Sequence, residues 1–134
     1  MGAKRSLHDN VATFAPRVRL PETRRVRCAF RSGDTTFFPR LEDVIWIQAR
    51  RNYSEVFMTT GNFTVREVLV SLERRLAQHG FLRVQRSTIV NLEHVVEIRR
   101  VGRGRYAVVL SNGSTVDVPA AVKDKIEQLL SDVP

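Results

Sequence analysis

Three short polar segments carry the side chains best suited to chemistry, and each lies between apolar stretches. They are Ala49–Ser54, Arg83–Ser87 and Pro119–Lys123. Arginine can donate two parallel hydrogen bonds to guanine, and asparagine or glutamine can pair with adenine in the same way. Arginine, lysine, serine and the free N–H groups at a helix start can hold phosphates. The residue types therefore suit DNA, although an arginine in a loop is usually just solvated.

Motifs for catalysis or metal binding are absent from the sequence. It contains no glycine-rich phosphate loop, no His/Cys cluster with metal-ligand spacing and no nucleophile elbow. The histidines are His8, His79 and His94, and none has an acid or nucleophile at a useful spacing. We therefore expect neither an enzyme nor a protein with a bound metal or cofactor.

The charge balance favours a polyanionic partner. The chain has 134 residues and a formal net charge of +8, from 22 Lys+Arg against 14 Asp+Glu. Residues 1–27 hold seven basic and two acidic groups, so the remaining residues carry a net charge of only +3. A DNA-binding function thus requires the basic groups to gather on one face, and composition alone leaves scattered, solvated arginines equally open.

The chain is long enough for one domain with a real core. Residues 1–23 show no sustained period and contain two prolines, which is typical of a flexible linker or tail. This basic tail could attract phosphates weakly or simply tether an upstream domain. Residues 24–132 are expected to form the folded domain.

The single cysteine and the lack of long apolar runs limit the cellular setting. Cys28 excludes an internal disulfide and is expected to be a small buried hydrophobe. No apolar stretch approaches the roughly 18 residues of a transmembrane helix, and no signal-peptide pattern follows the N-terminus. We therefore expect a cytoplasmic protein without a membrane partner.

Short strands that alternate with turns dominate the pattern. The expected strands are 24–31, 35–38, 42–49, 53–58, 63–66, 82–84, 95–101, 106–110 and 115–118. Ser111–Ser114 is a strong hairpin signal between the last two.

Two helices complete the expected pattern. An apolar stripe predicts a central helix through Val68, Leu69, Leu72 and Leu76, ended by Gly80. Pro119 is expected to open a C-terminal helix with a second apolar face, formed by Val122, Ile126, Leu129 and Leu130.

The order and spacing of these segments resemble the LytTR family of bacterial DNA-binding domains over roughly 26–130. The most specific part is FLRVQRSTIVNLEHVVEI, Phe81–Ile98, which resembles the family pattern F-x-R-V-x-R-S-x-I-V-N. The resemblance implies a mainly β fold of elongated, packed antiparallel sheets with a short central helix and a C-terminal helix. It also implies loops that enter two successive major grooves of double-stranded DNA.

The resemblance assigns roles to individual positions. It places the Asn52–Tyr53 loop in one groove, Arg86 on a base, and Arg83, Ser87 and Lys123 on phosphates. For Asn91 a structural role, in which the side chain fixes a turn, is favoured over a DNA contact. The full set of candidate DNA-binding residues is Arg50, Arg51, Asn52, Tyr53, Arg66, Arg83, Gln85, Arg86, Ser87, Asn91, Ala121 and Lys123.

Two positions depart from the family pattern. Gln85 stands where many members have histidine, which keeps a hydrogen-bonding group. Ala120 and Ala121 stand where many members carry arginine, so a base contact there is lost or replaced by apolar contact with a thymine methyl group.

The sequence therefore predicts the output domain of a bacterial transcription regulator of the response-regulator, two-component type. Expected partners are double-stranded DNA with paired direct repeats, a second protomer on that DNA, and an upstream receiver or sensor domain. The alternative is a protein-interaction module of the same fold with weak or lost DNA binding, which the alanines and the modest charge favour. Single-stranded RNA binding would need aromatic residues exposed on a sheet, for which Tyr53 and Tyr106 are the few candidates.

Overall fold

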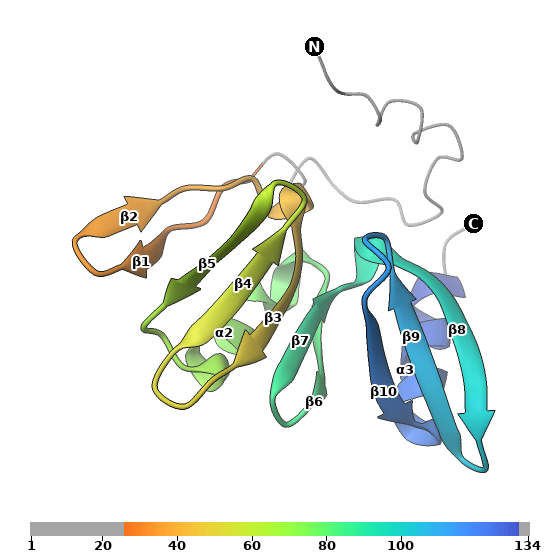
Figure 1. Cartoon of the computed structure of the whole chain (residues 1–134). Helices are drawn as coiled ribbons and strands as arrows, with labels where there is room; N and C mark the ends of the chain where they lie inside the picture. The colour runs from red at the N-terminus through yellow and green to blue at the C-terminus, as the bar shows by residue number, and fades with distance from the viewer. Residues whose placement is uncertain (1–25, 132–134) are drawn as a thin grey trace.

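A computed structural model describes residues 26–131, so the predicted tail lies outside the described residues. Three antiparallel sheets stand side by side in a row, with a helix behind each of the two larger ones (Figure 1). The strands are β1 Phe30–Ser32, β2 Thr35–Phe37, β3 Val44–Ala49, β4 Ser54–Met58, β5 Gly61–Val65, β6 Phe81–Gln85, β7 Thr88–Asn91, β8 Val95–Gly102, β9 Arg105–Leu110 and β10 Thr115–Pro119. The helices are α2 Leu69–Leu76 and α3 Ala120–Ser131. This arrangement confirms the expected mainly β fold.

The largest sheet has the strand order β5-β4-β3-β7-β6. Its strand β7 was not predicted, although all four of its residues are buried between β3 and β6. The strand begins and ends with a polar residue, Thr88 and Asn91, so the sequence shows only two consecutive apolar residues there and no strand pattern. Two interior strands of this sheet, β3 and β7, are covered by apolar side chains on both faces. This explains why the run Val44–Ile47 in β3 is apolar without alternation.

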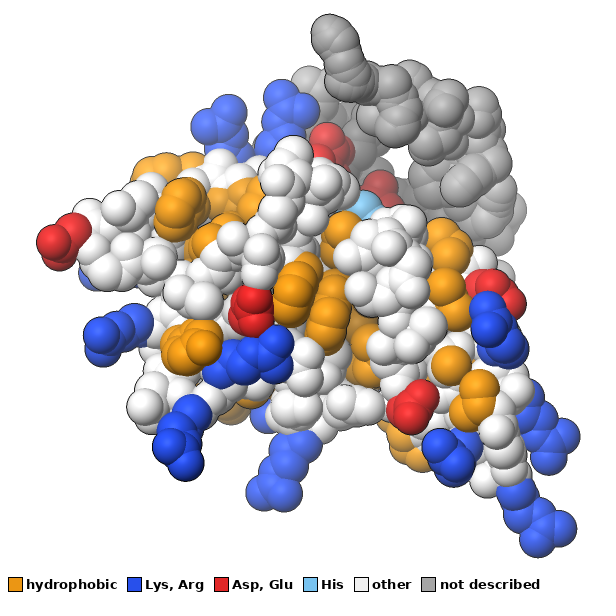
Figure 2. Space-filling model, in the orientation of Figure 1, with side chains coloured by type: hydrophobic (Ala, Val, Ile, Leu, Met, Phe, Trp, Pro, Cys, Tyr) orange, Lys and Arg blue, Asp and Glu red, His pale blue; other side chains and the backbone are white. Residues whose placement is uncertain are grey.

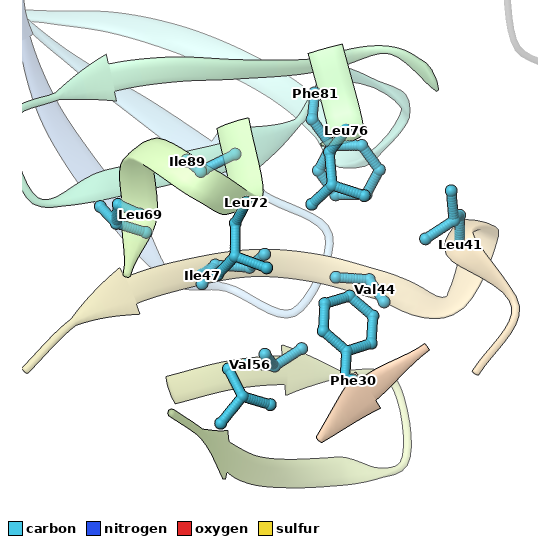
Figure 3. Close-up of a cluster of buried hydrophobic side chains, with 11 residues drawn as sticks. Phe30, Leu41, Val44, Ile47, Val56, Leu69, Leu72, Leu76, Phe81 and Ile89 are labelled. Carbon is cyan, nitrogen blue, oxygen red and sulfur yellow. The ribbon is translucent and has the colours of Figure 1, made fainter. Parts of the chain in front are cut away.

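The first core lies between this sheet and α2 (Figure 3). Leu69, Leu72 and Leu76 face the sheet and are nearly or fully buried. Burying one such side chain stabilises the fold by about 1.5–3 kcal/mol. Val68, predicted in the same stripe, precedes the helix as its N-cap and is 57% exposed. The helix ends at Leu76 and continues as a 3-10 turn, Ala77–His79, which Gly80 terminates with a φ of 86° that suits a residue without a side chain.

The second core lies on the opposite face of β3, β7 and β6. Ile45, Val84 and Val90 pack there against the three-stranded sheet β10-β9-β8 and against Ile126 of α3. The two larger sheets are therefore joined through a shared apolar layer. Leu129, predicted on the buried face of α3, is 44% exposed, so the apolar stripe of this helix is narrower than expected.

Two predicted boundaries at the ends of the domain were wrong. Among the described residues the first strand begins at Phe30, because residues 26–29, predicted in the same strand, make only one bridge, between Arg27 and Arg40. Cys28 is half-buried against the first core, where Arg75 Nη1 donates to its Sγ at 3.4 Å. Pro119 closes β10 opposite Arg105 instead of opening the last helix.

Within the described residues, neither helix is long and apolar enough to cross a membrane. The same residues contain no group of three or more His, Cys, Asp or Glu side chains that could hold a metal ion.

Candidate nucleic-acid interface

The strand register brings two of the predicted loops to one edge of the five-stranded sheet. Ala49 pairs with Ser54, and Ser54 pairs with Val65, so the β3–β4 loop and the residue after β5 end at the same level. Gln48 pairs with Thr88, and Thr88 with Gln85, which places the β6–β7 turn beside them. Ala49 N also donates to Ser87 O at 2.8 Å and ties the loop to the turn.

The three-stranded sheet presents its own loops at this edge. Gly102 and Pro119 both pair with Arg105, so the β8–β9 turn and the start of α3 lie at one end of that sheet. Gln85 Nε2 donates to Asp117 O and thereby aligns this end with the β6–β7 turn. These loops therefore form one continuous edge, at the bottom of Figure 1, which we call the loop edge.

Basic side chains project along the loop edge (Figure 2). Its exposed arginines are Arg50, Arg51, Arg66, Arg86, Arg103 and Arg105. Arg103 and Arg105 were not among the predicted residues, although the sequence Gly102–Arg105 has the alternating glycines of a tight turn that exposes its other residues. A row of cations on one edge is the arrangement that an extended polyanion requires.

The β3–β4 loop is closed at its base and open at its tip. Arg50 N donates to Tyr53 O at 2.7 Å, which closes a tight turn. Ser54 Oγ donates to Glu67 O at 2.8 Å and anchors the following strand. Arg51 and Asn52 are exposed at the tip, and Tyr53 is 39% exposed beside them. The predicted contact residues of this loop thus face solvent on a fixed base.

The β6–β7 turn exposes Arg86 and uses its neighbours as supports. Arg83 Nη2 donates to Arg86 O at 2.6 Å, and Arg83 Nη1 donates to Glu73 Oε1 at 3.2 Å. The geometry therefore favours a positioning role for Arg83 over the expected phosphate contact.

Gln85 is also held within the protein. Its Nε2 binds Asp117 O, and its Oε1 accepts from Thr88 Oγ1 at 3.1 Å. Arg86 itself makes no side-chain hydrogen bond or ion pair in the described part of the chain.

The start of α3 contributes little free charge. Ala121 is exposed and apolar. Lys123 Nζ lies 3.2 Å from Asp124 Oδ1, 3.3 Å from Glu127 Oε1 and 5.0 Å from the Tyr106 ring centre. The hydrogen bonds to Asp124 and Glu127 raise the pKa of Lys123, so its ammonium group stays charged. The two carboxylates already balance this positive charge within the protein. This segment is the least polar part of the loop edge, as the two alanines implied.

Asn91 does not lie at the loop edge. It occupies the opposite end of β7 and is 3% exposed. Its Nδ2 donates to Val44 O at 2.8 Å and to Leu41 O at 3.2 Å, and its Oδ1 accepts from Glu93 N at 3.0 Å. The geometry therefore favours the structural role over a DNA contact: in this fold the side chain caps the turn before β8.

Comparisons with known proteins agree with the fold. The sequence profile of the LytTr DNA-binding domain matches residues 34–131. Sensory transduction protein LytT of Bacillus subtilis is 26% identical over 104 residues, covering 78% of this chain and 43% of that protein. The CO-responsive transcriptional regulator RcoM of Rhodospirillum rubrum is 36% identical over 100 residues, covering 74% of this chain and 42% of that protein.

A solved structure has the same fold. It is the LytTr DNA-binding domain of a putative methyl-accepting/DNA response regulator from Bacillus cereus, with a TM-score of 0.66 and 22% identity. The match covers 78% of this chain and 96% of that one. The chain spans less than half the length of the LytT and RcoM relatives. Because the family profile covers most of it, the chain belongs to the LytTR family of DNA-binding domains.

Proposed function

We propose that the chain binds double-stranded DNA sequence-specifically through the loop edge, as the output domain of a bacterial transcription regulator. The observation that carries the proposal is the single edge on which the β3–β4 loop, the β6–β7 turn and the β8–β9 turn expose arginines together. Membership of a DNA-binding family points to binding and not to catalysis.

The domain is long enough to reach two successive major grooves. A compact domain of about 110 residues has a radius of gyration near 13 Å, so its long dimension reaches roughly one DNA turn, about 34 Å. The row of sheets in Figure 1 is longest parallel to the loop edge. We propose that the adjoining β3–β4 loop and β6–β7 turn meet the DNA at one point along this axis, and the β8–β9 turn with the start of α3 at another.

Each exposed side chain takes the role that its chemistry allows. Arg86, free at its turn, reads a guanine, while Arg51 and Asn52 read bases from the neighbouring loop. Arg66, Arg103 and Arg105 contact phosphates, which fixes the register of the domain on the duplex. The half-buried Ser87 lies beside Arg86 and can donate to a phosphate.

The relatives suggest the setting in which the domain works. Their names describe sensory transduction and CO-responsive transcriptional regulation. We propose that a receiver or sensor domain controls this output domain in the cytoplasm, and that two protomers occupy paired direct repeats.

One observation favours a protein-interaction module instead. Ala121 gives the start of α3 an apolar surface, and Lys123 beside it is compensated by acids. A protein partner, unlike DNA, would be suited to such a surface.

Selection of bound sequences from a random duplex pool separates the two functions. An enriched motif with two spaced half-sites supports DNA recognition by two protomers. Recovery of unenriched sequences at every salt concentration would leave the protein-interaction module as the better account.

A further inference from the structure

Arg50 differs from the other arginines of the loop edge because an acid compensates its charge within the protein. Arg50 Nε and Nη2 donate to Glu55 Oε1 at 3.0 and 2.7 Å. The other carboxylate oxygen, Glu55 Oε2, accepts from Asn62 Nδ2. The Glu55 side chain is 18% exposed against 37% for Arg50, so the carboxylate lies beneath the guanidinium and is held from two sides.

The sheet register shows which way Arg50 points. Gln48 pairs with Glu55 and Ala49 with Ser54, so Glu55 lies further into the sheet than Arg50 does. The two residues are diagonal neighbours on one face, a separation that long side chains can span. Arg50 therefore folds back from the loop edge onto the sheet, away from the tip that carries Arg51.

The remaining arginines of the loop edge are not held in this way. Within the described residues, Arg51, Arg66, Arg86 and Arg103 make no side-chain hydrogen bond or ion pair. Arg105 lies 3.9 Å from Asp117, and both side chains are 65% exposed. A pair this exposed contributes little, so Arg105 remains available to a ligand.

We propose that Glu55 raises the DNA specificity of the domain by competing with phosphate for Arg50; this rests on the proposed function. On an arbitrary duplex the exposed arginines supply the electrostatic attraction, and Arg50 stays with Glu55. A phosphate replaces the carboxylate only where the seated loops bring it within reach of Arg50. Non-specific DNA thus lacks one contact that the cognate complex gains, which widens the difference in affinity between them.

The test compares three variants by their affinity for a mixed-sequence duplex over a series of salt concentrations. Glu55→Gln removes the charge with little change of shape. Glu55→Asp keeps the charge but shortens the side chain, and thereby separates loss of contact from gain of net charge. The matched control is Glu97→Gln, because Glu97 forms a similar ion pair with Arg99 inside β8 and not in an edge loop.

One added phosphate contact steepens the salt dependence by about 0.9 and tightens binding about eightfold near 0.1 M salt. We expect this gain for Glu55→Gln, a smaller gain for Glu55→Asp, and no comparable gain for Glu97→Gln. Adding Arg50→Ala to Glu55→Gln should abolish the gain.

The inference is overturned if Glu55→Gln matches Glu97→Gln in affinity and slope, or if the gain survives Arg50→Ala. Both of those outcomes leave DNA binding by the unmodified chain in place. Failure of the unmodified chain to bind any duplex at low salt would instead overturn the proposed function together with the inference.

Discussion

Arg86 is the position at which removal of one side chain tests the proposed base contact most directly. Its side chain is exposed and free of polar partners in the described part of the chain. Its backbone is held from below, because Arg83 donates to Arg86 O and also to Glu73. Arg86→Ala should therefore delete the side chain and leave the turn in place.

The expected loss follows from the contact that the side chain would make. A bidentate arginine–guanine pair contributes about 1–3 kcal/mol of discrimination, which corresponds to roughly 5- to 150-fold in affinity. Stability should change by no more than about 0.5 kcal/mol, because an exposed side chain without partners is removed.

The assay measures affinity for the selected DNA motif and for duplexes with each base pair of that motif exchanged in turn. Arg86→Ala should weaken binding to the motif and lose its preference at one base position only. Arg74→Ala serves as the control, since Arg74 is an exposed arginine of α2 outside the loop edge. It should retain both the affinity and the preference.

A different outcome would refute the assignment. Equal weakening on the motif and on a scrambled duplex, with a salt dependence shallower by about 0.9, would place Arg86 on a phosphate. Unchanged binding on both duplexes would remove the β6–β7 turn from the interface.

Three further measurements test the site and the fold. If Arg66, Arg103 and Arg105 each neutralise a phosphate, log K for a mixed-sequence duplex should fall with log salt at a slope of about −2.7, and a flat response would contradict DNA binding. Asn91→Ala should lower the free energy of unfolding in urea by about 2–3 kcal/mol, because buried backbone groups lose their partners; an unchanged midpoint would argue against its capping role. Burial lowers the pKa of His94 below its usual value of about 6.5. The unfolded chain then binds more protons below that pH, so stability should fall as the pH drops below about 6.5, and His94→Gln should flatten this dependence.

Most of the local structure could be predicted from the sequence, because alternating apolar residues and turn residues act over short distances. The hairpin at Ser111–Ser114 and the stop of the helical segment at Gly80, after the 3-10 turn Ala77–His79, follow from such signals. Strand β7 could not be predicted in this way. Thr88 and Asn91 are 1% and 3% exposed, and the side-chain amide of Asn91 donates to Leu41 O and Val44 O, which are distant in sequence. Only the tertiary fold shows that these polar ends belong to a buried strand.

The candidate site also has a part that the sequence predicts and a part that depends on the tertiary fold. The side chains suited to DNA could be predicted from residue type and from the family resemblance, and their gathering on one edge required the strand order β5-β4-β3-β7-β6. The internal partners of Arg50 and Arg83 could not be predicted either, since each depends on an acid that the fold places. The pairing of Lys123 with Glu127, by contrast, is an i,i+4 pair on the predicted helix. The number of arginines in the sequence is therefore larger than the number whose charge is available to bind DNA.

The relative placement of the two larger sheets decides whether their loops can reach one duplex, and it is fixed at both ends. At the loop edge, Gln85 Nε2 donates to Asp117 O. At the opposite edge, His94 Nε2 lies 2.7 Å from Glu42 O, and His94 Nδ1 lies 2.7 Å from Ser111 Oγ. Because the backbone carbonyl of Glu42 can only accept, Nε2 carries the proton and Nδ1 accepts from Ser111. Between these two links lies the second core. The spacing of the loops is thus a property of the packed sheets, as precise positioning of contact residues requires.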